Sequence, residues 1–90
     1  MYRINNRQKA IAKKLGVQIR PSNRVGKKIA VFKNGKKIAD VGAKGYNDYH
    51  AYRRINRAIA DDKRKLYFAR HRADIKFPNP GYYAWWLLWN

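Results

Sequence analysis

Residues 26–42 constrain the fold more than any other segment. Asn34 and Gly35 lie between two apolar runs, and both residue types tolerate the positive φ that a type I′ turn requires. The sequence therefore predicts an antiparallel β-hairpin with Asn34-Gly35 as its two-residue turn. The expected cross-strand pairs are Lys33 with Lys36, Phe32 with Lys37, Val31 with Ile38, and Ala30 with Ala39.

This register sorts the hairpin side chains onto two faces, because side chains alternate along a strand. One face is expected to carry Ile29, Val31 and Ile38, and the other Ala30, Phe32, Ala39 and Val41. A lone hairpin is only marginally stable in water, so the helices that follow it are expected to cover it. The alternating segment 17–20 is expected to be a short strand that could add to the sheet.

Helical patterns flank the hairpin. Residues 5–15 have a cap at Asn5 or Asn6, a terminator at Gly16, and an apolar side of Ala10, Ile11 and Leu15. The basic face of this helix is either solvated or a phosphate-contacting arm.

A second helical pattern extends from Asp48 to about Asp74. It follows a glycine-containing segment, residues 42–45, that fits a structural turn or, alternatively, a phosphate-binding loop. Asn47 or Asp48 is the expected N-cap. The pattern fits one long helix, or two helices that separate at Asp61-Asp62 with one of these residues as the second N-cap. The expected buried stripe consists of Tyr52, Ile55, Ile59, Leu66 and Ala73.

The C-terminal segment predicts a turn followed by a short aromatic helix. Pro78 disfavours helix at Phe77, and Pro80 suits the first turn of a new helix. Four aromatic residues recur with helical spacing and are expected to complete the core, to anchor the protein to a partner, or both. These candidate partner-binding residues are Tyr82, Trp85, Trp86 and Trp89.

These patterns together predict an α+β fold in a single small basic domain of residues 1–90. Its expected parts are an N-terminal helix (1–16), a strand and β-hairpin (17–42), a helical segment (47–75) and an aromatic C-terminal helix (80–89). No cysteine is present to form a disulfide or a thiolate zinc site. The apolar run at residues 82–89 is too short to cross a bilayer, and no secretory signal is visible, so no membrane span is expected.

The charge of the chain is its strongest functional signal. The chain has twenty-two Lys and Arg residues but only five Asp and no Glu, for a formal net charge of +17. Such a surface repels itself and favours a polyanionic partner, and without a base-reading motif the expected binding is sequence-nonspecific, with DNA as the expected nucleic acid. The candidate contact residues are Lys27, Lys28, Lys36, Lys37, Lys44, Arg53, Arg54, Arg57, Arg64, Arg70 and Arg72.

No group of residues predicts catalysis. His50 follows Asp48, and His71 precedes Asp74, but the only serine, Ser22, lies in a turn and there is no cysteine nucleophile. Five Asp, some of them expected helix caps, leave few ligands for magnesium. We therefore expect no catalytic residues, no metal, no cofactor and no small-molecule ligand.

Three sequence blocks occur in a fixed order after the hairpin. They are Gly42-Ala-Lys-Gly45-Tyr46 with Asp48-Tyr49, Arg64-x-x-Tyr67-x-x-Arg70-His71, and Pro80-Gly81-Tyr82 followed by Leu88-Trp89. In this order they resemble a family of small basic proteins of large eukaryotic DNA viruses and related viral elements. The resemblance covers roughly residues 26–89 and leaves out the N-terminal helix. It implies a viral setting, in which a small, highly charged, non-enzymatic protein is often a virion component.

The expected function is a non-enzymatic viral structural protein. It would be a minor virion or capsid-associated component that contacts packaged nucleic acid or an acidic capsid surface, located in the virion and, during assembly, in the host cell interior. Its expected partners are capsid or other virion proteins and nucleic acid. The alternative is a soluble, sequence-nonspecific nucleic-acid-binding or condensing protein outside the capsid.

Overall fold

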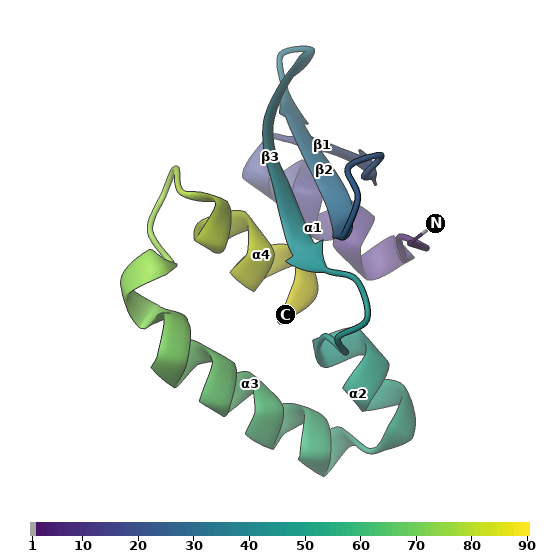
Figure 1. The fold of residues 1–90 in the computed structure, drawn as a ribbon, viewed down its shortest axis with the longest axis vertical. Helices are drawn as coiled ribbons and strands as arrows, with labels where there is room; N and C mark the ends of the chain where they lie inside the picture. The colour runs from purple at the N-terminus through teal and green to yellow at the C-terminus, as the bar shows by residue number, and fades with distance from the viewer. Residues whose placement is uncertain (1) are drawn as a thin grey trace. The chain divides into compact units, whose positions relative to one another are not determined.

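The computed structural model describes residues 2–90, which divide into two compact units (Figure 1). The first unit ends at Gly45 and contains α1 (Asn6–Leu15), β1 (Gln18–Pro21), β2 (Lys27–Lys33) and β3 (Lys36–Ala43). The second unit, Tyr46–Asn90, contains α2 (Tyr49–Ile55), α3 (Arg57–His71), a 3₁₀ turn η1 (Arg72–Asp74) and α4 (Pro80–Leu88). The predicted α+β class is confirmed, with three antiparallel strands and four α-helices within residues 2–90.

Helix α1 begins and ends where the sequence predicts. Asn5 Oδ1 accepts a hydrogen bond of 2.7 Å from the Gln8 N–H, and Gln8 Oε1 accepts one of 3.0 Å from the Asn5 N–H. This reciprocal capping box satisfies backbone donors that the first turn would otherwise leave unpaired. Gly16 then ends the helix in the left-handed conformation, with a φ of 73°.

The buried side of α1 agrees with the prediction only in part, because Ile11 and Leu15 are half-buried. Gln8 and Ala12 are its buried residues, whereas Ala10 is exposed. A polar residue such as Gln8 is not expected on the buried side of a helix, but nearby residues satisfy the hydrogen bonds of its amide. Its oxygen closes the capping box, and its nitrogen donates a 2.9 Å hydrogen bond to the Tyr2 hydroxyl. A hydrogen-bonded amide can therefore take an inward position.

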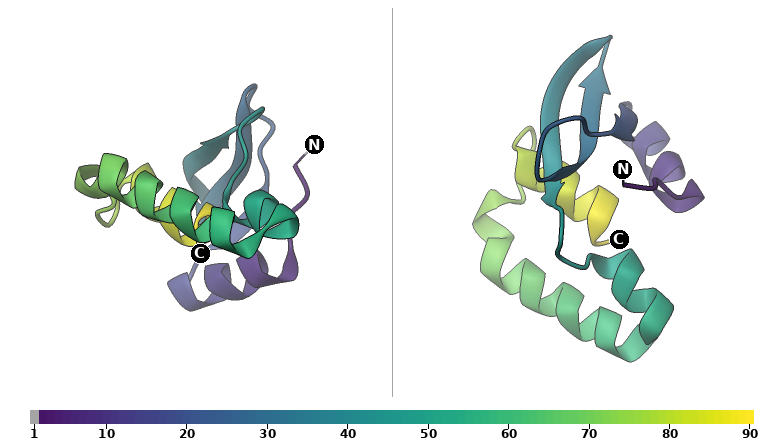
Figure 2. Two further views of the ribbon diagram at one scale, coloured as in Figure 1. Left: turned by 90° about the horizontal axis from the view of Figure 1, so that it is seen from below. Right: turned by 45° about the vertical axis from the view of Figure 1, so that its right-hand side comes forward.

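The three strands form one antiparallel sheet in the order β1-β2-β3. Asn34 and Gly35 have φ values of 53° and 78°, which confirms a turn with positive φ at both central residues. Next to the turn, Lys33 pairs with Lys36 and Phe32 with Lys37, as predicted. The alternating segment before Ser22 supplies the third strand. Both views in Figure 2 show the hairpin of β2 and β3 extending beyond α1 to this turn.

The predicted register is wrong beyond Phe32, because a β-bulge shifts the pairing by one residue. Val31 pairs with Ala39 instead of Ile38, and Ala30 pairs with Asp40 instead of Ala39. Ile38 is the additional residue of the bulge, and it is 41% exposed. The shift changes both faces of the hairpin. One face now carries Ile29, Val31, Ala39 and Val41, and the other carries Ala30, Phe32, Lys37 and Asp40.

The helical segment of the second unit consists of two helices, and the expected break at Asp61-Asp62 is wrong. Asp48 caps α2, since its Oδ1 accepts a 2.9 Å hydrogen bond from the Ala51 N–H. The helix is then interrupted at Asn56, whose backbone is extended with φ −163° and ψ 124°. Asn56 Oδ1 accepts hydrogen bonds from the N–H groups of Ala58 and Ile59, so this residue caps α3.

The predicted buried stripe of this segment is wrong except at Tyr52, which is half-buried. Ile55, Ile59 and Leu66 are exposed, and the buried residues are Tyr49, His50 and Ala60. The break at Asn56 interrupts the regular spacing on which the predicted stripe depends.

Helix α4 begins at Pro80, as predicted, and lies alongside α3 (Figure 2). Its most buried residues are Tyr83, Ala84, Leu87 and Leu88. The predicted aromatic face of α4 is partly buried, because Trp85 and Trp89 contact aromatic side chains of α3. Among residues 2–90, no helix combines the length and the apolar character needed to cross a membrane.

Candidate polyanion interface

The positive charge is divided unevenly between the two units. The unit that ends at Gly45 has thirteen Lys and Arg residues and one Asp, for a formal charge of +12. The unit that begins at Tyr46 has nine basic residues and four Asp, for a formal charge of +5. Because the units are equal in length, the first has the higher charge density and the stronger attraction for a polyanion.

The candidate lysines of the first unit lie at both ends of the hairpin. Lys36 and Lys37 are exposed beside the turn, where Lys36 pairs directly with Lys33. Lys27 pairs with Ala43 at the other end, close to Lys44, whose N–H donates a 2.9 Å hydrogen bond to the Gly26 carbonyl. The structure therefore forms two basic ends and does not bring these lysines into one cluster.

Lys28 is the one candidate of the hairpin that lies inward. Its side chain is buried, and its Nζ lies 5.5 Å from the centroid of the Tyr2 ring. An ammonium over an aromatic face is stabilised within the protein, so Lys28 contributes to the structure of the first unit.

Helix α1 provides basic residues that are not among the candidate contact residues predicted from the sequence. Its exposed side chains include Arg7, Lys9, Lys13 and Lys14. The helical pattern of the sequence could have identified them, because they occupy the positions of the helix that do not face its buried side. The alternative of a phosphate-contacting arm at residues 5–15 therefore stays a prediction, with these side chains available to solvent.

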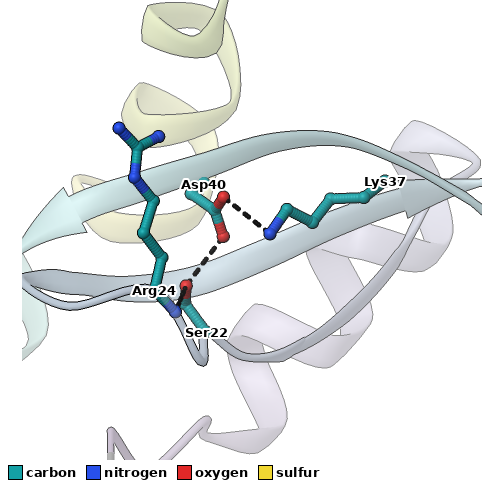
Figure 3. Close-up of polar contacts among 4 residues, drawn as sticks. All are labelled: Ser22, Arg24, Lys37 and Asp40. Carbon is teal, nitrogen blue, oxygen red and sulfur yellow. Dashed lines mark hydrogen bonds and ion pairs between the residues drawn. The ribbon is translucent and has the colours of Figure 1, made fainter.

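The one acid of the first unit is held in a polar network on one face of the sheet (Figure 3). Asp40 Oδ1 accepts a 2.7 Å hydrogen bond from the Ser22 hydroxyl, and Asp40 Oδ2 lies 2.9 Å from Lys37 Nζ. The Arg24 N–H in turn donates a 3.0 Å hydrogen bond to Ser22 Oγ. The Asp40 side chain is only 5% exposed. Its negative charge is thus committed to Lys37 within the sheet.

The β-bulge makes the Lys37–Asp40 contact possible. Residues three apart on a regular strand point to opposite faces, whereas the additional residue Ile38 returns Asp40 to the face of Lys37. The hydrogen bonds from Lys37 and then Ser22 lower the pKa of Asp40 and outweigh the opposing effect of burial. Sequence reasoning missed this residue, although it is the only acid among the first 45 residues.

The candidate arginines of the second unit have different surroundings. Arg53, Arg54 and Arg57 are exposed around the break at Asn56, and Arg70 and Arg72 are exposed at the end of α3. Arg64 is the exception, because its guanidinium lies 4.6 Å from the Tyr49 ring centroid and 3.8 Å from Asp61 Oδ1.

The candidate partner-binding aromatics are likewise separated by the structure. Trp89 stacks on Tyr67 with 4.4 Å between ring centroids, and Trp85 lies 5.0 Å from Phe68. Tyr82 is half-buried and makes an edge contact with Phe77, whereas Trp86 is 38% exposed. Burial, and secondarily the Asp74 carboxylate, raise the pKa of Tyr67. Trp85 and Trp89 therefore pack within the second unit.

The histidines do not form a metal-binding group with the acids. His71 Nδ1 lies 4.0 Å from Asp74 Oδ2, and its ring lies 4.4 Å from that of Tyr67. Within residues 2–90 no three His, Cys, Asp or Glu side chains are placed to bind a metal ion together.

A family model matches part of the chain. Residues 17–53 are similar to a family of unknown function (DUF5754). The matched segment spans the β-sheet, the turn that follows it and the start of α2, and it includes Ser22, Lys37 and Asp40. No curated protein and no solved structure matches the chain.

Proposed function

We propose that this protein is a non-enzymatic structural component of a virion, which binds packaged nucleic acid through its surface charge. The observation that carries this proposal is the formal charge of +12 on the first unit, whose one acid is already paired with Lys37. A surface with this excess of cations gains free energy when phosphates replace its counterions.

The hairpin turn has the most specific arrangement of charges in the proposed interface. Lys33 and Lys36 are directly opposite each other, and like charges in this position destabilise a sheet. Two positive charges on neighbouring strands attract a phosphate more strongly than one, so binding is favoured without any contact to a base edge. The expected binding is therefore independent of sequence.

The viral setting of the proposal rests on the three ordered sequence blocks between Gly42 and Trp89. In that setting the nucleic acid is the packaged genome, and an acidic capsid surface would attract the same lysines. Capsid or other virion proteins are accordingly the proposed protein partners.

Binding across a salt series tests the proposed role. The purified chain is titrated into duplex and single-stranded DNA and RNA of scrambled sequence at increasing salt. We expect little sequence or strand preference, and a steep loss of affinity with a slope of roughly −0.9 per phosphate neutralised on duplex DNA. Weak binding at low salt would contradict the proposal and leave acidic proteins as the partners.

A charge variant tests the role of the hairpin. Lys36→Gln should reduce the magnitude of the salt slope by about 1, because one phosphate contact is lost. Lys76→Gln, which removes the same charge from the second unit, is the matched control and should leave the slope unchanged. Equal slopes for both variants would place the interface elsewhere.

The same charge distribution supports a second candidate, a soluble nucleic-acid-condensing protein that stays outside the capsid. Purification of virions distinguishes the two. Stoichiometric retention of the protein with capsid proteins after high salt and nuclease treatment would support the structural role. Its loss under those conditions would support the soluble factor.

A further inference from the structure

Two aliphatic side chains lie on an outward side of α3, and a third lies at the end of α2. Ile59 is 43% exposed, Leu66 is 51% exposed and Ile55 is 71% exposed. Ile59 and Leu66 are seven residues apart, so they lie one above the other on the same side of the helix. These three residues are called the aliphatic strip below.

The strip is distinct from the side of α3 that packs within the second unit. That side uses Ala60, which is fully buried, and the rings of Tyr67 and Phe68, which contact Trp89 and Trp85 of α4. Helix α3 thus has one apolar side that packs on α4, although Phe68 on that side is 40% exposed, and a second one that faces solvent. Three large aliphatic residues exposed in series are more than the scattered apolar residues of an ordinary surface.

Basic side chains surround the strip. Arg70 follows Leu66 by four residues, and Lys63 follows Ile59 by four, so each cation is a helix neighbour of an aliphatic residue. The Lys63 Nζ itself lies 5.8 Å from the Tyr52 ring centroid. Arg54 and Arg57 are exposed on either side of the break at Asn56, and they add positive charge to the segment around Ile55. Asp62 is the one acid on this side of α3. These cations form a basic rim beside the strip, and this rim matches a partner of negative charge.

We propose that the aliphatic strip docks an amphipathic, acidic helix of a partner protein. The apolar side chains of that helix would pack on Ile55, Ile59 and Leu66, while its carboxylates would meet the surrounding cations. This interface goes beyond the proposed function, because it uses the second unit and does not depend on nucleic-acid binding by the first.

The chemistry of the strip favours this occupant over the other polyanions and over a second copy. Aliphatic side chains gain nothing from phosphates and offer no flat ring on which a base can stack. A second copy would bring another formal charge of +17 to a rim that is already basic. Two aliphatic residues on α3 also make a narrower apolar face than membrane-surface helices present.

A pair of designed peptides provides the probe. The first is a helical peptide with Leu on one face and Glu elsewhere, and the second is a scrambled peptide of the same composition. Fluorescence anisotropy with the full chain measures both affinities. We expect the patterned peptide to bind about tenfold more tightly, because only it presents contiguous apolar surface to the strip.

Variants of the protein test whether the preference for the patterned peptide depends on the strip. Ile59→Gln with Leu66→Gln should abolish the preference for the patterned peptide and leave binding to scrambled-sequence DNA unchanged. Val25→Gln is the matched control, because Val25 is 96% exposed and lies in the first unit, and it should retain the preference. Circular dichroism verifies that each variant is folded.

Four results would overturn the inference. Equal affinity for the two peptides would mean that charge alone attracts acidic partners. An undiminished preference in the double variant would place the apolar contact elsewhere. Strip-dependent binding to phosphatidylglycerol vesicles without any peptide preference would identify a lipid surface. Strip-dependent self-association in sedimentation would identify a second copy.

Discussion

The Ser22 hydroxyl donates a 2.7 Å hydrogen bond to the carboxylate of Asp40, which joins the end of β1 to β3 across the central strand (Figure 3). Ala30 lies between the two outer strands on this face, since it pairs with Arg20 on one side and with Asp40 on the other. Its methyl group leaves room for the two polar side chains to meet. The sheet is therefore held by a polar contact in addition to its backbone ladder.

This network predicts a specific pH dependence of stability. The pKa of Asp40 is lowered in the folded state, so Asp40 stabilises the fold at pH values above its unfolded pKa of about 4. The contribution is lost as the pH falls from there through the lower folded pKa. Asp40→Asn should cost about 1 kcal/mol at neutral pH, since Lys37 is partly exposed, and the difference from wild type should shrink in acid. Thermal unfolding at several pH values measures this difference.

Asp62→Asn is the control for this measurement. Asp62 is exposed on α3, so its substitution should change stability by less than about 0.5 kcal/mol at neutral pH. A stability difference for Asp40→Asn that stays constant from neutral to acidic pH would contradict the role of the carboxylate charge.

The hairpin turn is sensitive to β-branched residues. Gly35 has a φ of 78°, and no atom would contact a Cβ added there, so a substitution changes backbone strain without a steric clash. Gly35→Val should cost about 1–2 kcal/mol, whereas Gly35→Asn should cost less, because Asn tolerates positive φ. Chemical denaturation compares the two variants. An unchanged midpoint for Gly35→Val would count against the turn.

The cap at Asn56 should stabilise the first turn of α3. Asn56→Ala removes the acceptor for the Ala58 and Ile59 N–H groups and should destabilise the second unit by about 1 kcal/mol. Asn56→Asp retains the acceptor and should be tolerated. Far-ultraviolet circular dichroism during thermal unfolding measures both variants, and equal melting temperatures would show that the cap contributes nothing.

Gly81 allows the start of α4 to approach η1 closely. A Cβ at this position would meet the Asp74 carbonyl, whose carbon would lie 2.9 Å away. Because the obstacle is backbone, Gly81→Ala should cost about 1–3 kcal/mol. Asn79→Ala is the neighbouring control and should be nearly neutral, since the Asn79 side chain makes no capping hydrogen bond. Similar unfolding midpoints for the two variants would contradict the close approach.

The tryptophans of α4 should contribute unequally to stability. Trp89→Ala removes the stacked ring that lies 4.4 Å from Tyr67 and should cost about 2–3 kcal/mol. Trp86→Ala, at a 38% exposed residue, should cost about 1 kcal/mol. Urea unfolding of the two variants measures the difference. A larger loss for Trp86→Ala would reverse the assignment of Trp89 as the packed residue.

The candidate interface was predictable in its charge and not in its geometry. Composition alone indicates a polyanion partner, because 22 basic residues cannot find partners among five acids. Composition does not indicate that Lys28 turns inward to Tyr2 or that Lys37 is paired with Asp40. These outcomes depend on which side chains the fold places nearby, and the neighbours lie far along the chain.

Local chemistry determined the boundaries of most elements. The turn at Asn34-Gly35 and Pro80 at the start of α4 act within a few residues, so the sequence is sufficient to predict them. For the caps at Asn5 and Asp48 the sequence narrows the choice to two neighbouring residues each. Tertiary structure decided the bulge at Ile38, and with it the meeting of Asp40 and Ser22, which lie 18 positions apart. It also decided which side of α3 is covered. Periodicity shows that a helix has an apolar side, but only the packing of Ala60 and Tyr67 leaves Ile59 and Leu66 to solvent.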